Sequence, residues 1–158
     1  MQRYTLLFVF TVLLLLPVSP VSAQDSWTAE QQEVLASMEL LSAATAPDGA
    51  GADDYAAILA EGFSRWTTGR GKIKDKQVWV DGVRGWFEDG WRVVDRNQEV
   101  LEVSVSGEYA FSRRIVEETY QGPDGESSVS KAGVAETWVR GAGPWLLLRV
   151  NVVVLTGE

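Results

Sequence analysis

The chain has 158 residues, of which 14 are basic and 22 acidic, for a formal net charge of −8, and it contains neither cysteine nor histidine. These absences exclude disulfides, cysteine nucleophiles, Ser-His-Asp triads and imidazole-based zinc sites. The acidic balance disfavours nucleic acid and anionic lipid as partners, since both require a concentrated cationic surface. No motif for a metal or cofactor is found, so none is expected.

Residues 1–23 have the pattern of an export signal. Arg3 precedes an apolar run over residues 6–16, and a small-residue triplet ends at Ala23. The alternative is an uncleaved membrane anchor, but the run is well short of the roughly 20 apolar residues that cross a bilayer. We therefore expect cleavage after Ala23, a periplasmic or secreted location without membrane attachment, and a single domain over residues 24–158.

Three helices are predicted in the first half of this domain. Thr28 and Gln31 form a capping-box pattern before a helix over about residues 29–44. Asp53 is the expected N-cap of a second helix, with Tyr55 on its buried stripe, that continues to about residue 62. A short strand over residues 64–68 then leads to a third helix capped by Asp75.

From residue 91 onward the apolar period changes from 3.6 to 2. Four runs, over residues 91–105, 108–121, 127–140 and 145–155, are separated by short segments rich in glycine and proline. Short turns of this kind connect antiparallel neighbours, so an antiparallel meander is predicted. Helices followed by strands indicate an α+β fold.

Symmetric pairing about these turns predicts two sheet faces, neither of them plainly polar. It also places Glu136 opposite Arg149 on neighbouring strands. A sheet with apolar residues on both faces needs two covers, and a second copy of the protein is the simplest candidate for the second one. One predicted face carries Leu101, Val103, Ala110, Val116, Ala135, Leu148, Val150 and Val152; the other carries Tyr109, Phe111, Ile115, Trp138, Leu147, Val153, Glu102, Arg113, Glu136, Arg149 and Asn151.

The order of these elements resembles the NTF2-like (SnoaL-like) superfamily. Three segments carry the resemblance: the helix-to-strand segment 55–63, the hairpin 103–110 with Gly107 before an acid, and the closing hairpin 136–151 with a glycine shortly before Trp145. The resemblance implies a cystatin-type cone, in which the N-terminal helices pack in a curved antiparallel sheet with a pocket at its wide end. It also implies frequent dimerisation through the sheet. Members include isomerases, cyclases and non-catalytic binding domains, so the fold does not decide the function.

Two catalytic patterns of that superfamily are missing from this chain. Ketosteroid-isomerase-type members have a tyrosine in the first helix and a carboxylate base after the second, and neither is present here. Many relatives carry a pocket histidine near the end of the last strand, where this chain has Asn151.

Candidate pocket residues are chosen from the predicted sheet face and from the second helix. Glu136 is the best candidate for a general base, with Arg149 or Asn151 to polarise a carbonyl group. The simpler interpretation is a cross-strand ion pair on a surface. Aromatic side chains complete the predicted ligand site, which contains Tyr55, Trp66, Tyr109, Trp138, Arg149 and Asn151. The consecutive pairs Arg113-Arg114 and Glu117-Glu118 put one member on each face and are interpreted as a solvated edge.

The leading functional hypothesis is an exported homodimeric domain that binds a small, partly apolar ligand without catalysis. The first alternative is an isomerase or cyclase that acts on an enolisable carbonyl compound with Glu136 as base. The second alternative is a protein-interaction module that uses the outer sheet face. Whether Glu136, Arg149 and Asn151 point inward together distinguishes the first two hypotheses.

Overall fold

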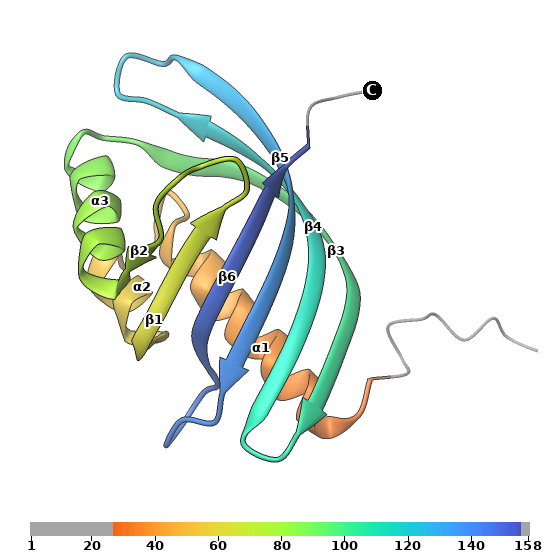
Figure 1. The fold of residues 1–158 in the computed structure, drawn as a ribbon. Coiled ribbons are helices and arrows are strands. Elements are labelled where there is room, and N and C mark those ends of the chain that lie inside the picture. The colour runs from red at the N-terminus through yellow and green to blue at the C-terminus, as the bar shows by residue number, and fades with distance from the viewer. Residues whose placement is uncertain (1–26, 156–158) are drawn as a thin grey trace, which may run out of the picture.

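A computed structural model describes residues 27–155, which form three helices and one six-stranded sheet (Figure 1). The sheet is strongly curved, and helix α1 runs along its inner side. The predicted export signal lies outside the described residues. Within residues 27–155, no helix is long and apolar enough to cross a bilayer.

Helix α1 (Ala29–Ala44) has the predicted boundaries because its start is encoded locally. The Thr28 hydroxyl accepts a hydrogen bond from the Gln31 amide, while the Gln31 side chain accepts one from the Thr28 amide. This reciprocal capping satisfies two backbone donors that would otherwise lack partners. Val34, Met38 and Leu41 lie on the buried face of the helix, against the sheet.

Helix α2 (Ala52–Ala57) is shorter than predicted. It begins after Gly51, whose φ of 95° favours glycine, and Asp53 lies inside its first turn instead of capping it. The chain leaves the helix at Ile58 and enters strand β1 (Leu59–Thr67), five residues before the predicted strand. Short apolar runs such as this one satisfy either periodicity, and here Leu59 and Phe63 are buried from a strand.

A two-residue strand β2 (Lys74–Asp75) pairs with β1 and precedes helix α3 (Lys76–Glu88). The predicted cap is confirmed, because the Asp75 carboxylate accepts a hydrogen bond from the Val78 amide at 2.9 Å. Helix α3 lies beside β1 and β2, at one edge of the sheet (Figure 1).

The predicted meander is confirmed as strands β3 (Arg92–Ser106), β4 (Tyr109–Gln121), β5 (Ser127–Val139) and β6 (Leu146–Val154). The strand order across the sheet is β2-β1-β6-β5-β4-β3. All neighbours are antiparallel except β1 and β6, which are parallel. The first long strand thus lies against the last one, which the sequence pattern did not predict.

The observed register corrects the predicted faces of β5. Ser112 pairs with Glu136, and Ala110 pairs with Trp138, so Glu136 and Trp138 belong to the inner face together with Ala110. The expected opposition of Glu136 and Arg149 is wrong, since an irregularity after Thr137 pairs Glu136 with Val150. A shift of one residue moves a side chain to the other face of a sheet.

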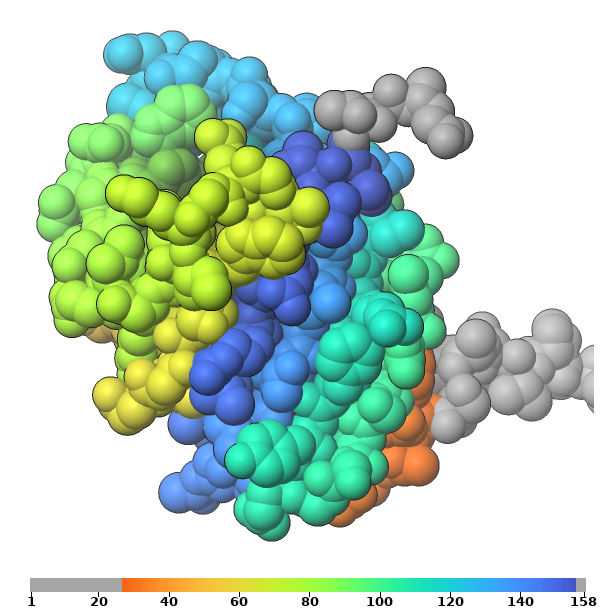
Figure 2. All heavy atoms as spheres, viewed as in Figure 1, coloured from red at the N-terminus to blue at the C-terminus, as the bar shows by residue number. Residues whose placement is uncertain are grey.

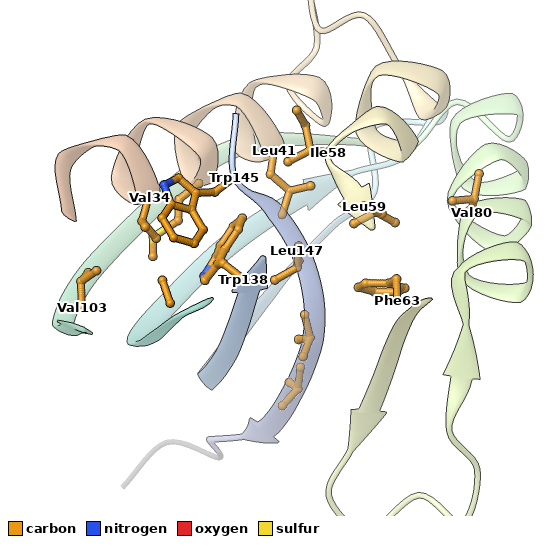
Figure 3. Packing of buried hydrophobic residues seen from close by; sticks show 14 residues of the cluster. Val34, Leu41, Ile58, Leu59, Phe63, Val80, Val103, Trp138, Trp145 and Leu147 are labelled. Atoms are coloured by element: carbon orange, nitrogen blue, oxygen red, sulfur yellow. The ribbon is translucent and has the colours of Figure 1, made fainter. Parts of the chain in front are cut away.

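The core lies between α1 and the inner face of the sheet (Figure 3). Trp138 and Trp145 are its largest fully buried side chains, and they pack beside Val34 of α1. The cluster continues through Leu147 and Leu59 toward Phe63, where the packing gives way to a cavity. Figure 2 shows the opposite face of the sheet, where no helix of the described residues covers the strands.

Candidate functional site

A cavity of about 440 Å³ lies on the inner side of the sheet. Its walls come from the C-terminal end of α1, from α2, β1 and α3, and from the inner faces of β3 to β6. Apolar side chains form much of the lining, and charged and phenolic groups are inserted among them. The apolar part includes Leu41, Phe63, Val83, Val93, Val116, Ala132, Val134, Leu147, Val150 and Val152; the polar part includes Tyr55, Arg65, Lys74, Arg96, Arg114, Glu118, Tyr120 and Glu136.

Glu136 lies in the cavity wall with only 1% of its surface exposed. One carboxylate oxygen accepts a hydrogen bond from Arg114 Nη2 at 2.7 Å, and the other accepts one from the Ser112 hydroxyl at 2.8 Å. The Ser112 oxygen in turn accepts a hydrogen bond from the indole of Trp138 at 3.0 Å. Because a buried carboxylate is costly without partners, this network is what allows Glu136 to lie there.

Arg114 connects Glu136 to the surface of α1. Its Nη1 donates to Gln98 at 2.6 Å, and the Gln98 amide donates to Glu39 of α1. The Nε atom of Arg114 is buried and has no hydrogen-bond partner within the described residues. Arg114 lines the cavity, and 9% of its side-chain surface is exposed.

A second ion pair lies farther along the same face of β4. Glu118 accepts hydrogen bonds from Arg96, whose Nη1 and Nη2 also donate to the Ser42 carbonyl and the Thr45 hydroxyl at the end of α1. The Tyr120 hydroxyl donates to the other oxygen of Glu118. Burial, followed by the neighbouring Glu118 carboxylate, raises the pKa of Tyr120 above its ordinary value. These hydrogen bonds hold Arg96 and Glu118 in place between α1 and the sheet.

Tyr55 and Trp79 join α2 to α3 at the cavity. The Tyr55 oxygen accepts a hydrogen bond from the Trp79 indole at 3.1 Å. Burial raises the pKa of Tyr55, so its hydroxyl keeps its proton. That proton has no acceptor among residues 27–155 and remains available to a bound molecule.

Arg65 of β1 stacks on the same indole, with its guanidinium carbon 4.2 Å from the ring centroid of Trp79. It lines the cavity, and its side chain makes no hydrogen bond or ion pair with the part of the chain that the structure describes. Burial lowers the pKa of Arg65 from its ordinary value. Arginine pKa values start so high that the group remains a cation.

The structure brings together only some of the residues chosen from the sequence. Tyr55 and Glu136 both line the cavity. Trp138 is fully buried in the core behind it, where its indole donates to Ser112. These three residues lie on the inner side of the sheet.

The other four chosen residues lie outside the cavity. Arg149 and Asn151 are exposed, and Arg149 donates to the carbonyls of Gly62 and Leu148. Tyr109 is 55% exposed at the start of β4. Trp66 is 39% exposed and donates to the carbonyl of Arg70. The expected cluster of Glu136, Arg149 and Asn151 does not form.

Four charged residues of the cavity were not predicted from the sequence, namely Arg65, Arg96, Arg114 and Glu118. The last two belong to the consecutive charged pairs that were interpreted as a solvated edge. Their signal was the strict alternation of Arg114, Val116 and Glu118 along one strand face, which the structure shows to be the inner one. The outer members of the pairs, Arg113 and Glu117, are exposed as expected.

The carboxylates of the cavity are already engaged by protein donors. A general base must bring a lone pair of an oxygen or nitrogen within reach of the proton that it removes. Both oxygens of Glu136 and both oxygens of Glu118 already accept hydrogen bonds. No group of three or more acidic residues among residues 27–155 is arranged to hold a metal ion.

No protein-family model matches the sequence, and no curated protein matches it significantly. Solved structures do resemble it in fold. A ketosteroid isomerase-like protein from Erwinia carotovora superposes with a TM-score of 0.65 at 18% identity, over 83% of this chain and all of the other. An NTF2-like protein from Cytophaga hutchinsonii gives 0.66 at 8% identity, over 81% and 100% of the two chains. A cystatin-like fold protein from Nostoc punctiforme gives 0.59 at 14% identity, over 87% and 96%. The chain thus has the NTF2-like fold, as the order of its elements indicated.

Proposed function

We propose that this protein, a chain with the NTF2-like fold, is exported and binds a small, partly apolar molecule in the cavity on the inner side of its sheet. The observation that carries the proposal is the 440 Å³ cavity itself, with its mixed lining of apolar side chains and a few polar groups. Ligand sites of proteins have this size and this composition.

A packing defect would not produce such a space. Protein interiors are packed as densely as organic crystals, and their voids seldom exceed a water molecule. Here the space is bordered by ion pairs and phenols that are held in place by their own hydrogen bonds. Side chains fixed in this way form a preorganised wall, which reduces the entropy lost on binding.

Catalysis with Glu136 as base is the less favoured alternative. Its supporting observation is that Glu136 lines the cavity. Against it, the carboxylate is held in an ion pair with Arg114, which stabilises its ionised form, and the carbonyl-polarising partners Arg149 and Asn151 lie outside the cavity. Arg114 is the only cation that contacts Glu136 within the described residues.

The outer sheet face supports a separate proposal, the predicted homodimer. Tyr109, Val129 and Val153 are between about half and two thirds exposed on this uncovered face. Apolar side chains gathered on one face are typical of an interaction surface. Sedimentation equilibrium of the purified protein tests this proposal, and a monomer at all concentrations would contradict it.

Binding is tested with a neutral fluorescent probe, N-phenyl-1-naphthylamine, and a pair of matched variants on strand β5. Val134 lines the cavity, whereas Val129 is exposed on the other face of the same strand. Val134→Trp should fill the cavity and abolish probe binding, and Val129→Trp should leave it unchanged. The variant Ala132→Leu fills less of the space and should weaken binding while retaining the near-ultraviolet circular dichroism of the folded protein.

Two results would contradict the proposal. One is equal binding of the probe by the wild type and by a folded Val134→Trp variant. The other is a wild-type protein that binds no probe and carries no small molecule in native mass spectrometry after purification.

A further inference from the structure

We infer that the ligand is an organic monoanion, a carboxylic acid with an apolar body, whose carboxylate is bound by Arg65 at the mouth of the cavity. This inference rests on the proposed binding function and specifies the chemical class of its ligand. It is carried by the unpaired cations that surround Trp79.

Arg65 is positioned as a carboxylate receptor. Its guanidinium carbon lies over the Trp79 indole, 4.2 Å from the ring centroid, and this cation–π contact restrains the group. Its side-chain donors have no hydrogen-bond partner within residues 27–155. A guanidinium whose face is stacked presents a rigid fork of N–H groups, which matches the two oxygens of a carboxylate.

The cavity has more positive than negative groups after its ion pairs are counted. Glu136 is paired with Arg114, and Glu118 is paired with Arg96. Arg65 and Lys74 form no ion pair with the described residues, although Glu118 lies near enough to Arg65 to act on its charge, and the Lys74 ammonium lies 5.3 Å from the same indole. Two cations that converge on one ring repel each other, and an anion between them removes that repulsion.

The space next to Arg65 is also lined by positively charged side chains. A second hollow adjoins the cavity, and the two share Arg65, Lys74 and Trp79 in their linings. Its other charged residues are Arg70 and Lys72, so four cations and no acid line it. The whole chain carries a net charge of −8, so this concentration of cations is local. A positive mouth on a negative surface steers small anions toward it.

One further donor extends the site. The Tyr55 hydroxyl accepts from Trp79 and retains its own proton for a ligand oxygen. The lining also includes apolar side chains such as Phe63 and Val150, which suit a hydrocarbon body.

The test compares 2-naphthoate with 2-naphthamide, two ligands of the same shape that differ in charge, by isothermal titration calorimetry. The wild type should bind the acid at least about tenfold more tightly than the amide, because hydrogen bonds to charged groups are the strong ones. Arg65→Gln should abolish this preference and still bind the amide. Arg113→Gln removes a cation from the outer face and should keep the full preference.

The outcomes separate this inference from the function on which it rests. Equal binding of acid and amide by the wild type would overturn the inference and leave a neutral-ligand site. An unchanged acid preference in Arg65→Gln would also overturn it. Failure of the naphthyl compounds and the neutral probe to bind at all would overturn both proposals.

Discussion

Replacing Arg114 with methionine should lower the free energy of unfolding by about 3–5 kcal/mol, the range found when one partner of a buried ion pair is removed. The range for buried pairs applies because both side chains are almost inaccessible to solvent: Arg114 is 9% exposed and Glu136 is 1% exposed. Solvent cannot replace the lost hydrogen bond to Glu136. Urea denaturation of the purified protein, followed by tryptophan fluorescence, measures the change.

The neighbouring residue provides the control. Arg113 points to the outer face and pairs with Glu102 at 3.0 Å, but their side chains are 60% and 43% exposed. Arg113→Met should therefore cost less than about 1 kcal/mol. The double variant Arg114→Met/Glu136→Gln should recover much of the loss, because it removes the unpaired charge. If Arg114→Met costs no more than Arg113→Met, the assignment of Arg114 and Glu136 to a buried pair is wrong.

Three other changes have definite expected outcomes. Thr28→Ala should lower the free energy of unfolding by about 1 kcal/mol, whereas Thr28→Ser, which keeps the capping hydroxyl, should not; equal losses would rule out the cap as the cause. Gly49→Ala would place a methyl group against main-chain oxygens in the last turn of α1 and should cost about 1–3 kcal/mol, while Gly143→Ala meets open space and should stay within about 0.5 kcal/mol. Since the pKa of Tyr120 is raised in the folded protein, the unfolded chain loses this proton first, and the free energy of unfolding should fall as the pH rises above about 10. Urea titrations across that pH range should show a shallower fall in Tyr120→Phe and an unchanged one in Tyr109→Phe; the same fall in both variants would contradict the assignment.

Features that depend on neighbouring residues in the sequence were predicted well. The capping box of Thr28 and the cap at Asp75 each span only four consecutive positions, so the starts of α1 and α3 follow from local chemistry. The four long strands were recognised from their period and their turns. The start of β1 was not, because a six-residue helix followed by buried apolar residues satisfies both helical and strand periods.

The candidate site was harder to predict because it depends on register and on pairing between distant strands. A single irregularity after Thr137 separates Glu136 from Arg149, and the pairing of β4 with β5 gives Glu136 a different cation, Arg114. The proposed role of Arg65 depends on its side chain having no ion-pair partner among the described residues. No local pattern shows which arginine will remain without an acid after the chain has folded.

The position of β6 in the sheet restricts the order in which the domain can fold. This strand ends the described chain, yet it lies between β1 and β5 inside the sheet. Strand β1 cannot complete its ladder until β6 is in place, since the Leu147 amide donates to the carbonyl of Ile58 and the Thr68 amide donates to that of Val152. Contacts between such distant segments slow folding, because the intervening chain must be ordered first.

During synthesis, the hairpins β3-β4 and β4-β5 have all their residues before β6 emerges. Arg65 and Trp79 are translated early, but β6, the strand that pairs with β1 beside Arg65, is translated last among the described strands. A chain that lacks its final strand would therefore leave two strand edges open, and exposed edges of this kind promote aggregation. The cavity therefore cannot form until β6 has been synthesised, because this strand supplies part of its wall.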